Sequence, residues 1–236
     1  MIKVGKLAAI LKLPYYRTRL LRHRVAAGVE HAGVLSGLDC RTVVDIGASR
    51  GQFALVARKC HPQALIISFE PLPTAAAKFR AVFVDDDRVT LHDVAIGPLS
   101  GNATIHISKR EDSSSLLPIT STQVALFPGT EEVATTIVRV GPLLEFISAE
   151  DIQTPALLKL DVQGFELEAL RGCEELLDRF AYVYVECSFV ELYAGQALAD
   201  EVIAWLRERG FRLHGVHNMD YDRDGRAIQA DFLFAR

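Results

Sequence analysis

The sequence has few cysteines and no long hydrophobic run, and both shortages limit what the protein can be. Its 236 residues include only four cysteines, none in C-x-x-C spacing, which argues against zinc-ribbon and thioredoxin-like sites and favours reduced thiols. No apolar stretch approaches the ~20 residues of a membrane-spanning helix, and no cleavage site for a signal peptide follows residues 7–11. No tight cluster of acids is present, so we expect no metal site. We therefore expect a cytoplasmic protein.

The first 24 residues lack acidic side chains, although the whole chain has a net charge of -4. A basic segment of this kind favours contact with an anionic membrane, a phosphorylated carrier or an acidic partner. The alternative is a solvated helix face that packs on an acidic body. Only two tyrosines accompany the basic residues, so we expect no nucleic-acid partner. The basic residues of this segment are Lys3, Lys6, Lys12, Arg17, Arg19, Arg22 and Arg24.

The order of apolar and polar segments predicts one α/β domain behind an N-terminal extension. Half of the residues are hydrophobic and 24% are charged, which is typical of a globular protein with a full core. We predict a basic helical extension over residues 1–38, with an amphipathic helix over 15–35, and a main domain over 39–236. Strand-like and helix-like segments alternate in the main domain, which favours a Rossmann-like, mostly parallel sheet with helices on both faces.

Seven strands are expected in this sheet, and the last two form a closing antiparallel hairpin around Asp224-Gly225. The helices expected between them cover residues 52–59, 73–83, 164–176 and 200–209. The expected strands cover residues 42–45, 64–70, 89–96, 157–160, 182–186, 211–217 and 230–235.

Residues 98–152 interrupt this alternation. Two short stretches with alternating polarity, residues 102–108 and 135–140, predict an inserted hairpin or lid at the ligand end of the sheet. A surface insertion without a role in binding is the alternative.

A glycine-bearing turn and a second acid point to a nucleotide pocket. The turn lies in residues 43–53, VVDIGASRGQF, and the second acid is Glu70 in FEP. A dinucleotide fingerprint would have a glycine where Ser49 stands, and its acid would follow sooner. Asp45 before the turn would repel a pyrophosphate but attract a cationic ligand. This favours S-adenosylmethionine over NAD, whereas a turn without any ligand is the remaining alternative.

Several segments together resemble the FkbM family of S-adenosylmethionine-dependent methyltransferases, a class I family. They are VVDIGASRGQF (43–53), SFEP (68–71), AIG (95–97), SSSL (113–116) and LLKLDVQGFELEALRG (157–172). The family often has asparagine at the position of Ser49 and glutamate at that of Gln163. The resemblance implies that the cofactor is S-adenosyl-L-methionine, bound by Asp45, Gly47, Ala48, Ser49, Gly51, Glu70, Asp93, Val94, Ala95 and Asp161.

Methyl transfer to a hydroxyl needs alignment and a base. Asp161, Glu186 and His217 are the predicted catalytic residues, since each ends a predicted strand at or near the crevice. For Asp161 the alternative is a role confined to positioning the cofactor, and for Glu186 it is a structural role. The family resemblance implies O-methylation of a sugar, a glycan or a natural product. The rival functions are an NAD-linked oxidoreductase and a partner-binding module that has lost catalysis.

Overall fold

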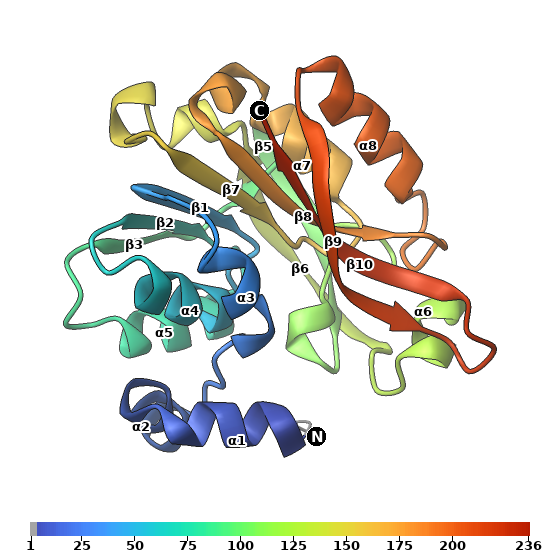
Figure 1. Ribbon diagram of the computed structural model, residues 1–236. Coiled ribbons are helices and arrows are strands. Elements are labelled where there is room, and N and C mark those ends of the chain that lie inside the picture. The colour runs from blue at the N-terminus through green and yellow to red at the C-terminus, as the bar shows by residue number, and fades with distance from the viewer. Residues whose placement is uncertain (1–3) are drawn as a thin grey trace.

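The computed structural model describes residues 4–236, and its centre is a seven-stranded sheet with strand order β3-β2-β1-β7-β8-β10-β9 (Figure 1). All neighbouring strands from β3 to β8 are parallel, and β10 runs antiparallel to both β8 and β9. The predicted fold class and closing hairpin are therefore confirmed. The strands are β1 (Thr42–Ile46), β2 (Leu65–Phe69), β3 (Val89–His92), β7 (Ala156–Leu160), β8 (Tyr182–Ser188), β9 (Arg212–Tyr221) and β10 (Ala227–Ala235).

Helices cover both faces of this sheet, and successive residues of the central strands point into two separate cores. On one face, Val43 and Leu157 pack with α3 (Ala32–Leu35), α4 (Gln52–Cys60) and α5 (Pro73–Val82). On the other, Val44 and Leu158 pack with α7 (Glu166–Gly172) and α8 (Ala199–Glu208). Every residue of β1 and β7 is buried, which explains why these strands are mostly apolar apart from Thr42, Asp45 and Lys159.

The predicted third strand, residues 89–96, is wrong as a single element. The chain bends after His92, and Ala95–Ile96 forms β4 in a second, three-stranded sheet of order β4-β6-β5. The partner of β4 is β6 (Glu132–Gly141), which lies far along the chain, so no local pattern could reveal the change of sheet. The antiparallel pair of β6 with β5 (Gly101–Ser108) confirms the two predicted stretches of residues 98–152 as strands.

The connection from β5 to β6 and the segments that follow β6 contain short helical elements. They are the 3₁₀ helix η2 (Glu111–Ser113), the helix α6 (Ser121–Leu126), and the 3₁₀ helices η3 (Leu143–Glu145) and η4 (Ala149–Asp151). A further 3₁₀ helix, η5 (Glu174–Arg179), follows α7.

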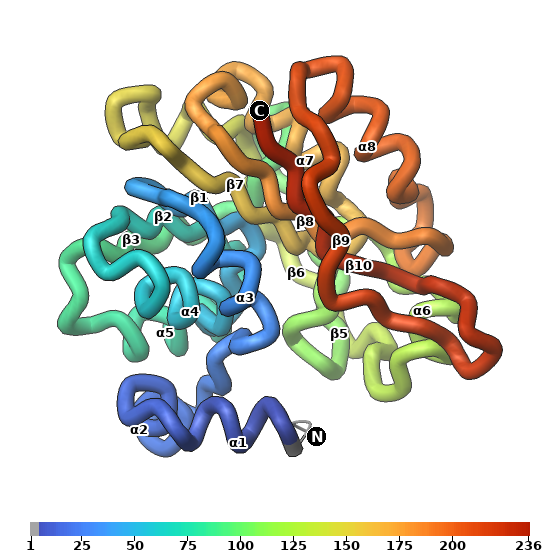
Figure 2. Tube along the Cα trace, in the orientation of Figure 1, coloured from blue at the N-terminus to red at the C-terminus, as the bar shows by residue number. Residues whose placement is uncertain are grey.

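The predicted single helix over residues 15–35 is also wrong. The N-terminal segment forms two helices, α1 (Val4–Lys12) and α2 (Pro14–His23) (Figure 2). Arg24, the residue after α2, has a left-handed φ of 58°. The residues after α2 form no helix or strand, and helical structure resumes only in η1 (Val29–His31) and α3. Val25 and Ala27 lie in this non-helical stretch and are buried in the hydrophobic core, so their helix-like spacing reflects packing against the domain and not a helix. Lys3, one of the predicted basic residues, lies outside the described residues.

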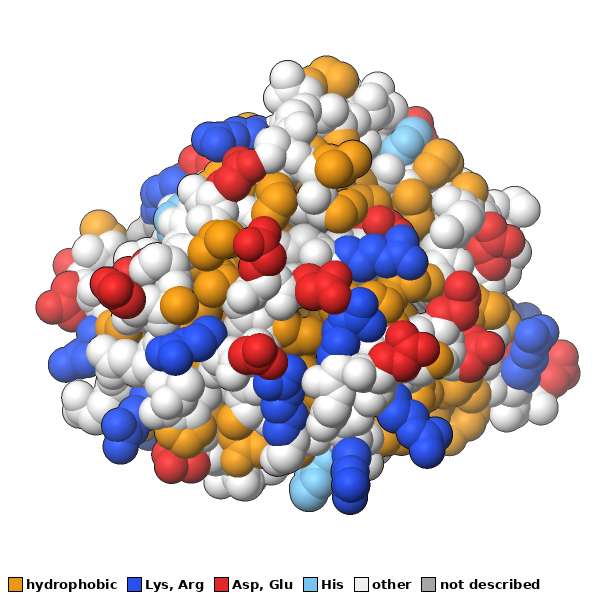
Figure 3. All heavy atoms as spheres, turned by 90° about the horizontal axis from the view of Figure 1, so that it is seen from above, with side chains coloured by type: hydrophobic (Ala, Val, Ile, Leu, Met, Phe, Trp, Pro, Cys, Tyr) orange, Lys and Arg blue, Asp and Glu red, His pale blue; other side chains and the backbone are white. Residues whose placement is uncertain are grey.

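The surface opposite the ligand edge carries mixed charge. Viewed from above, acidic and basic side chains are interspersed instead of gathered by sign (Figure 3). No helix within residues 4–236 is long and apolar enough to cross a membrane. The thiols of Cys40, Cys60, Cys173 and Cys187 are all free.

Candidate active site

A cavity of about 1240 Å³ lies where β1, β2, β7 and β8 end. In an open α/β sheet the crevice outside the carboxyl ends of the strands is where ligands bind. The cavity brings together predicted residues from distant parts of the sequence: Gly47, Ala48, Ser49, Glu70, Val94, Ala95, Asp161 and Glu186. Residues 110–116 of the inserted segment form another part of its wall.

The glycine turn after β1 is fixed by close backbone packing. Gly47 has a φ of 78°, and a Cβ at this position would lie 1.9 Å from the carbonyl oxygen of Asp161. The amide groups of Gly47 and Ala48 both donate to the carbonyl of Phe69, each at 3.0 Å. Only glycine therefore allows β1 and β7 to approach at this edge, and the turn ties the end of β1 to the end of β2.

Glu70 is a buried carboxylate directly beside this turn. Its Oε2 accepts the amide of Ser49 at 2.9 Å, and its Oε1 accepts the amide of Leu72 at 2.8 Å. Burial raises the pKa of Glu70 to about 7, and the two amide donors oppose that rise. Each carboxylate oxygen keeps a further lone pair, so Glu70 can accept two more hydrogen bonds, as a ribose diol would supply.

Asp45 lies behind the cavity wall instead of in it. The residue is fully buried, and its Oδ1 lies 3.0 Å from the Nζ of Lys159 on the neighbouring strand β7. Nζ also donates to the carbonyl of Gly47 at 3.2 Å and lies 3.8 Å from Oδ2 of Asp161. Burial disfavours the lysine's charge, but Asp45 and Asp161 together raise the pKa of Lys159, which keeps it protonated. Asp45 is thus connected to the cavity through Lys159, which lines it.

Lys159 itself was not among the predicted site residues. It lines the cavity, and its ammonium group lies 5.4 Å from the ring centroid of Phe53. A lysine in the middle of the otherwise apolar strand ALLKL was the available signal, because a buried lysine needs a partner of opposite charge.

Gln163 joins two of the predicted catalytic acids. Its Nε2 donates to Oδ1 of Asp161 at 2.7 Å and to Oε2 of Glu186 at 3.0 Å, and Tyr193 donates to its Oε1 at 2.6 Å. Gln229 donates to the other oxygen of Glu186 at 3.1 Å. Burial, followed by the nearby charges of Asp161 and Asp231, raises the pKa of Glu186 well above its ordinary value. The raised pKa favours the neutral form of Glu186. A neutral carboxyl group can hydrogen-bond a ligand but is poorly suited to take up a further proton.

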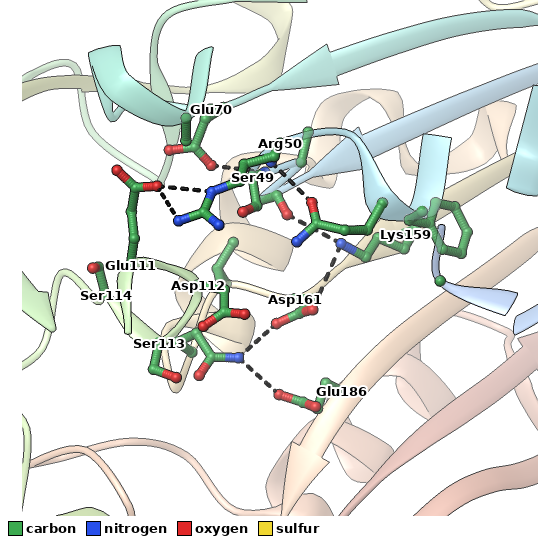
Figure 4. Close-up of a pocket in the computed structure, with 18 of the residues that line it drawn as sticks. Ser49, Arg50, Glu70, Glu111, Asp112, Ser113, Ser114, Lys159, Asp161 and Glu186 are labelled. Atoms are coloured by element: carbon green, nitrogen blue, oxygen red, sulfur yellow. Dashed lines mark hydrogen bonds and ion pairs between the residues drawn. The ribbon is translucent and has the colours of Figure 1, made fainter. Parts of the chain in front are cut away.

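The inserted segment reaches the glycine turn through an ion pair. The guanidinium of Arg50 donates to Oε2 of Glu111 at 3.0 and 2.7 Å, and Thr74 donates to the other oxygen of Glu111 (Figure 4). On the same segment, the hydroxyl of Ser115 donates to the carbonyl of Gln163 at 2.6 Å. These contacts hold residues 110–116 across the carboxyl edge of the sheet.

Three further predicted residues do not line the cavity. A Cβ on Gly51 would lie 2.7 Å from the ring of Phe83, so this glycine serves packing behind the turn. The side chain of Asp93 is half exposed and pairs with Arg80 at 2.8 Å. His217 lies on β9, with its ring 6.4 Å from that of Tyr184. Their predicted roles in binding or catalysis stay predictions.

Sequence reasoning also missed His31, Asn218, Gln229 and Asp231, which all line the cavity. They come from η1 and from the two closing strands, and no motif surrounds any of them. Within residues 4–236, no three or more His, Cys, Asp or Glu side chains are arranged to hold a metal ion.

The relatives found by comparison with known proteins are methyltransferases. The 2-O-methyltransferase NoeI of Sinorhizobium fredii is 29% identical over 65% of this chain and 66% of its own length. The 31-O-demethyl-FK506 methyltransferase FkbM of Streptomyces tacrolimicus is 30% identical over 72% of each chain. A putative RNA methyltransferase of Pyrococcus horikoshii, PH1948, has the same fold, with a TM-score of 0.52, 12% identity, and 99% and 98% of the two chains covered.

The family profile described as the methyltransferase FkbM domain matches residues 45–213, which include the glycine turn, Glu70, Lys159, Asp161 and Glu186. This match covers well over half of the chain and spans the cavity wall from β1 to β9. It leaves no ground for the alternative of an NAD-linked oxidoreductase. The chain belongs to the FkbM family of methyltransferases.

Proposed function

We propose that this protein transfers a methyl group from S-adenosyl-L-methionine to a hydroxyl oxygen of a sugar, a glycan or a natural product. Family membership supports the methyl transfer, and the names of two relatives, a 2-O-methyltransferase and a 31-O-demethyl-FK506 methyltransferase, favour oxygen as the acceptor atom. The observation that carries the choice of cofactor is Glu70, a buried carboxylate with free lone pairs beside a glycine turn.

The polar groups at this end of the cavity fit an adenosyl group. Ser49 Oγ is buried and makes no hydrogen bond within residues 4–236, so a bound ligand would satisfy it. Val94, Ala95 and Ile96 provide an apolar wall near Glu70, as a purine ring requires. Glu70 would hold the ribose hydroxyls, and Ser49 would donate or accept one further hydrogen bond. When bound, S-adenosylmethionine supplies an activated methyl group on a sulfonium.

The protein's own contribution is alignment and removal of a proton. Asp161 and Lys159 lie at the boundary between the adenosyl end and the rest of the cavity, where the methionine carboxylate and ammonium can each find an opposite charge. Beyond them, the amides of Gln163, Gln229 and Asn218 and the carboxyl groups of Glu186 and Asp231 line the remaining space. Such a wall offers many hydrogen bonds to a polyhydroxylated acceptor, which supports a sugar hydroxyl as the target.

Calorimetric titration with S-adenosylhomocysteine tests the cofactor. We expect micromolar binding by the intact protein, loss of binding in Glu70→Ala, and unchanged binding in Asp85→Ala, whose side chain is exposed and outside the cavity. Asp45→Ala is a poor probe because it would leave Lys159 buried without its nearest partner. Failure of the intact protein to bind would contradict the proposal.

Turnover is then tested with a radiolabelled methyl donor and the methyl glycosides of glucose, galactose, mannose, fucose and rhamnose. Methylated product from any of them supports O-methylation of a sugar. Firm cofactor binding with no product from these sugars or from hydroxylated natural products would favour the alternative of a module without catalysis.

We also propose that α1 and α2 dock the protein on an anionic membrane. Leu7 and Leu11 on α1 and Leu21 on α2 are exposed, and the cations Lys12, Arg17 and Arg22 are exposed beside them. Exposed leucines among cations suit the interface of an anionic bilayer, where the charges attract headgroups and the leucines enter the acyl boundary. This surface would bring the cavity to a lipid-borne acceptor.

Sedimentation with phosphatidylglycerol vesicles measures this docking. Binding should fall at least tenfold in Lys12→Glu/Arg17→Glu/Arg22→Glu and should be absent with phosphatidylcholine alone. Deletion of residues 1–24 would be less informative, because Ile10 and Tyr16 are buried against the domain core. Equal binding of the triple variant would contradict the proposal.

A further inference from the structure

His31 lies on the cavity wall although it belongs to the N-terminal segment. Its ring packs edge-on against Phe53 at 5.3 Å and against Tyr184 at 5.7 Å, and its side chain is 17% exposed. The residue ends η1, which is fixed to the domain by a hydrogen bond from the amide of Gly28 to the carbonyl of Gln52 at 2.9 Å. The imidazole is therefore held in one place by aromatic rings and backbone.

A chain of hydrogen bonds orients one nitrogen of this ring. The Tyr184 hydroxyl donates to Oδ2 of Asp231 at 3.1 Å, and Asn218 donates to the same oxygen at 2.7 Å. Because the tyrosine proton is directed to Asp231, its oxygen is free to accept a hydrogen bond from Nδ1 of His31, which lies 3.1 Å away. The carboxylate of Asp231 lies 3.5 Å from the same nitrogen and also favours a proton there. The amide nitrogen of Asn218 also lies 3.4 Å from Nδ1, but it donates to Asp231 at the shorter distance of 2.7 Å, so the arrangement favours the neutral tautomer with hydrogen on Nδ1.

The other nitrogen, Nε2, keeps its lone pair. It makes no hydrogen bond within residues 4–236, and its nearest charged neighbour is Oε1 of Glu30 at 4.0 Å. Gly28 and His31 both line the cavity, and Gly28 packs closely beside the ring: a Cβ there would lie 3.0 Å from Cδ2 and 3.5 Å from Nε2, so only a residue without a side chain keeps this edge of the imidazole uncovered. Nε2 is thus the side of the imidazole that an acceptor hydroxyl can approach.

Three acids that line the same part of the cavity are held by fixed neighbours. Glu186 has a donor on each oxygen, Asp161 has one oxygen on Gln163 and the other near Lys159, and Asp231 receives two donors on Oδ2. These donors limit the directions from which an acceptor hydroxyl can approach the carboxyl oxygens, whereas Nε2 of His31 has no such donor within residues 4–236.

We propose that His31 is the general base of the methyl transfer, and that Tyr184 and Asp231 are positioning residues that hold its proton on Nδ1. The proposal rests on the proposed function. In the step, the acceptor oxygen forms a bond to the methyl carbon and the carbon–sulfur bond breaks, with its electron pair passing to sulfur. The acceptor's proton moves to Nε2 of His31, and Asp231 and Glu30 stabilise the resulting imidazolium.

Several charged groups surround the imidazole. Burial lowers the pKa of His31 and is the largest influence on it. The nearby charges of Asp231, Glu30 and Asp161 raise this pKa, while that of Lys159 lowers it. The net change is downward. Lys6 on α1 reduces the influence of Glu30 through a 2.7 Å ion pair. His31 is therefore neutral at pH 7, as a base must be, and we expect kcat to fall only on the acidic side of the ordinary histidine pKa.

The tautomer can be read directly from nitrogen-15 correlation spectra of histidine-labelled protein, with and without S-adenosylhomocysteine. We expect His31 to carry its proton on Nδ1 at pH 7 and to lose this preference in Tyr184→Phe. A proton on Nε2 in the intact protein would overturn the proposal, and this readout needs no acceptor.

Kinetics with the best methyl glycoside provide the second test. His31→Gln should lower kcat about 100-fold or more, which is the usual contribution of a general base, while binding of S-adenosylhomocysteine stays within twofold. The exposed His214→Gln on β9 is the matched control and should keep full activity. A His31→Gln variant that keeps more than a third of kcat would overturn the proposal, whereas loss of S-adenosylhomocysteine binding by the intact protein would contradict only the proposed function.

Discussion

The proposed nucleotide end and the proposed acceptor end of the cavity are built in different ways. At the nucleotide end, the glycine turn and Glu70 come from β1, β2 and the residues directly after them, and backbone amides hold the carboxylate. At the acceptor end, His31, Gln163, Glu186 and Asp231 come from four distant segments, and side chains hold one another. A short sequence motif is enough to specify the backbone geometry at the first end. The side-chain network at the second end forms only when the whole chain has folded.

The two ends also differ in how charge is balanced. Glu70 is held by neutral amide donors, while Asp45 and Asp161 both lie beside the ammonium group of Lys159. Substitutions should therefore act mainly on cofactor binding at the first end, on catalysis at the second, and on stability where the ends meet.

The largest effect is expected at that boundary. Lys159→Met removes the partner of the fully buried Asp45 and should lower the free energy of unfolding by about 3–5 kcal/mol. Urea denaturation measures the change. The double variant Asp45→Asn/Lys159→Met should recover most of the loss, and the exposed Lys59→Met should change little. An unchanged free energy of unfolding in the single variant Lys159→Met would show that burial of Asp45 does not depend on this ion pair.

The next effect separates the two ends. Glu70→Ala removes the acceptor of both ribose hydroxyls and should raise the Kd for S-adenosylhomocysteine about 100-fold, or about 2.7 kcal/mol. His31→Gln should leave that Kd within twofold. Calorimetry on both variants measures the contrast, and equal losses would show that the two ends do not act separately.

The pH dependence of cofactor binding should follow Glu70. Because burial raises its pKa to about 7, the ionised form that accepts ribose hydroxyls dominates above pH 7 and is lost below it. The Kd for S-adenosylhomocysteine should therefore rise about tenfold between pH 8 and pH 6. Glu70→Gln cannot titrate, so its weaker binding should not change with pH. The same slope in both proteins would assign the dependence to another group.

The smallest effect concerns the space beside His31. Gly28→Ala places a Cβ 3.0 Å from the imidazole and should displace the ring by a few tenths of an ångström, lowering kcat a few-fold with little change in stability. Gly33→Ala is the matched control, since nothing lies within 4 Å of its Cβ. Steady-state kinetics distinguish the two, and equal rates would show that the catalytic step tolerates movement of the ring.

Local patterns predicted the elements well where a segment's environment follows from its own residues. Residues 42–45 and 157–160 form buried strands because a parallel sheet covered on both faces requires continuous apolar runs. Prediction was wrong where a distant partner decided the outcome. β4 leaves the main sheet to pair with β6, and Val25 and Ala27 are buried outside any helix.

The sequence by itself determined the fold class, because strand-like and helix-like segments alternate along the main domain, and it determined the glycine turn at Gly47 and the place of Glu70, because each depends on backbone geometry within a short segment. The tertiary structure alone decided that Lys159 neutralises Asp45, that Gln163 joins Asp161 to Glu186, and that His31 meets Tyr184 and Asp231. Except for Gln163 and Asp161, which share the loop after β7, those contacts join segments far apart in the sequence. Their spacing along the chain carries no signal, since distance in sequence does not limit distance in a folded sheet.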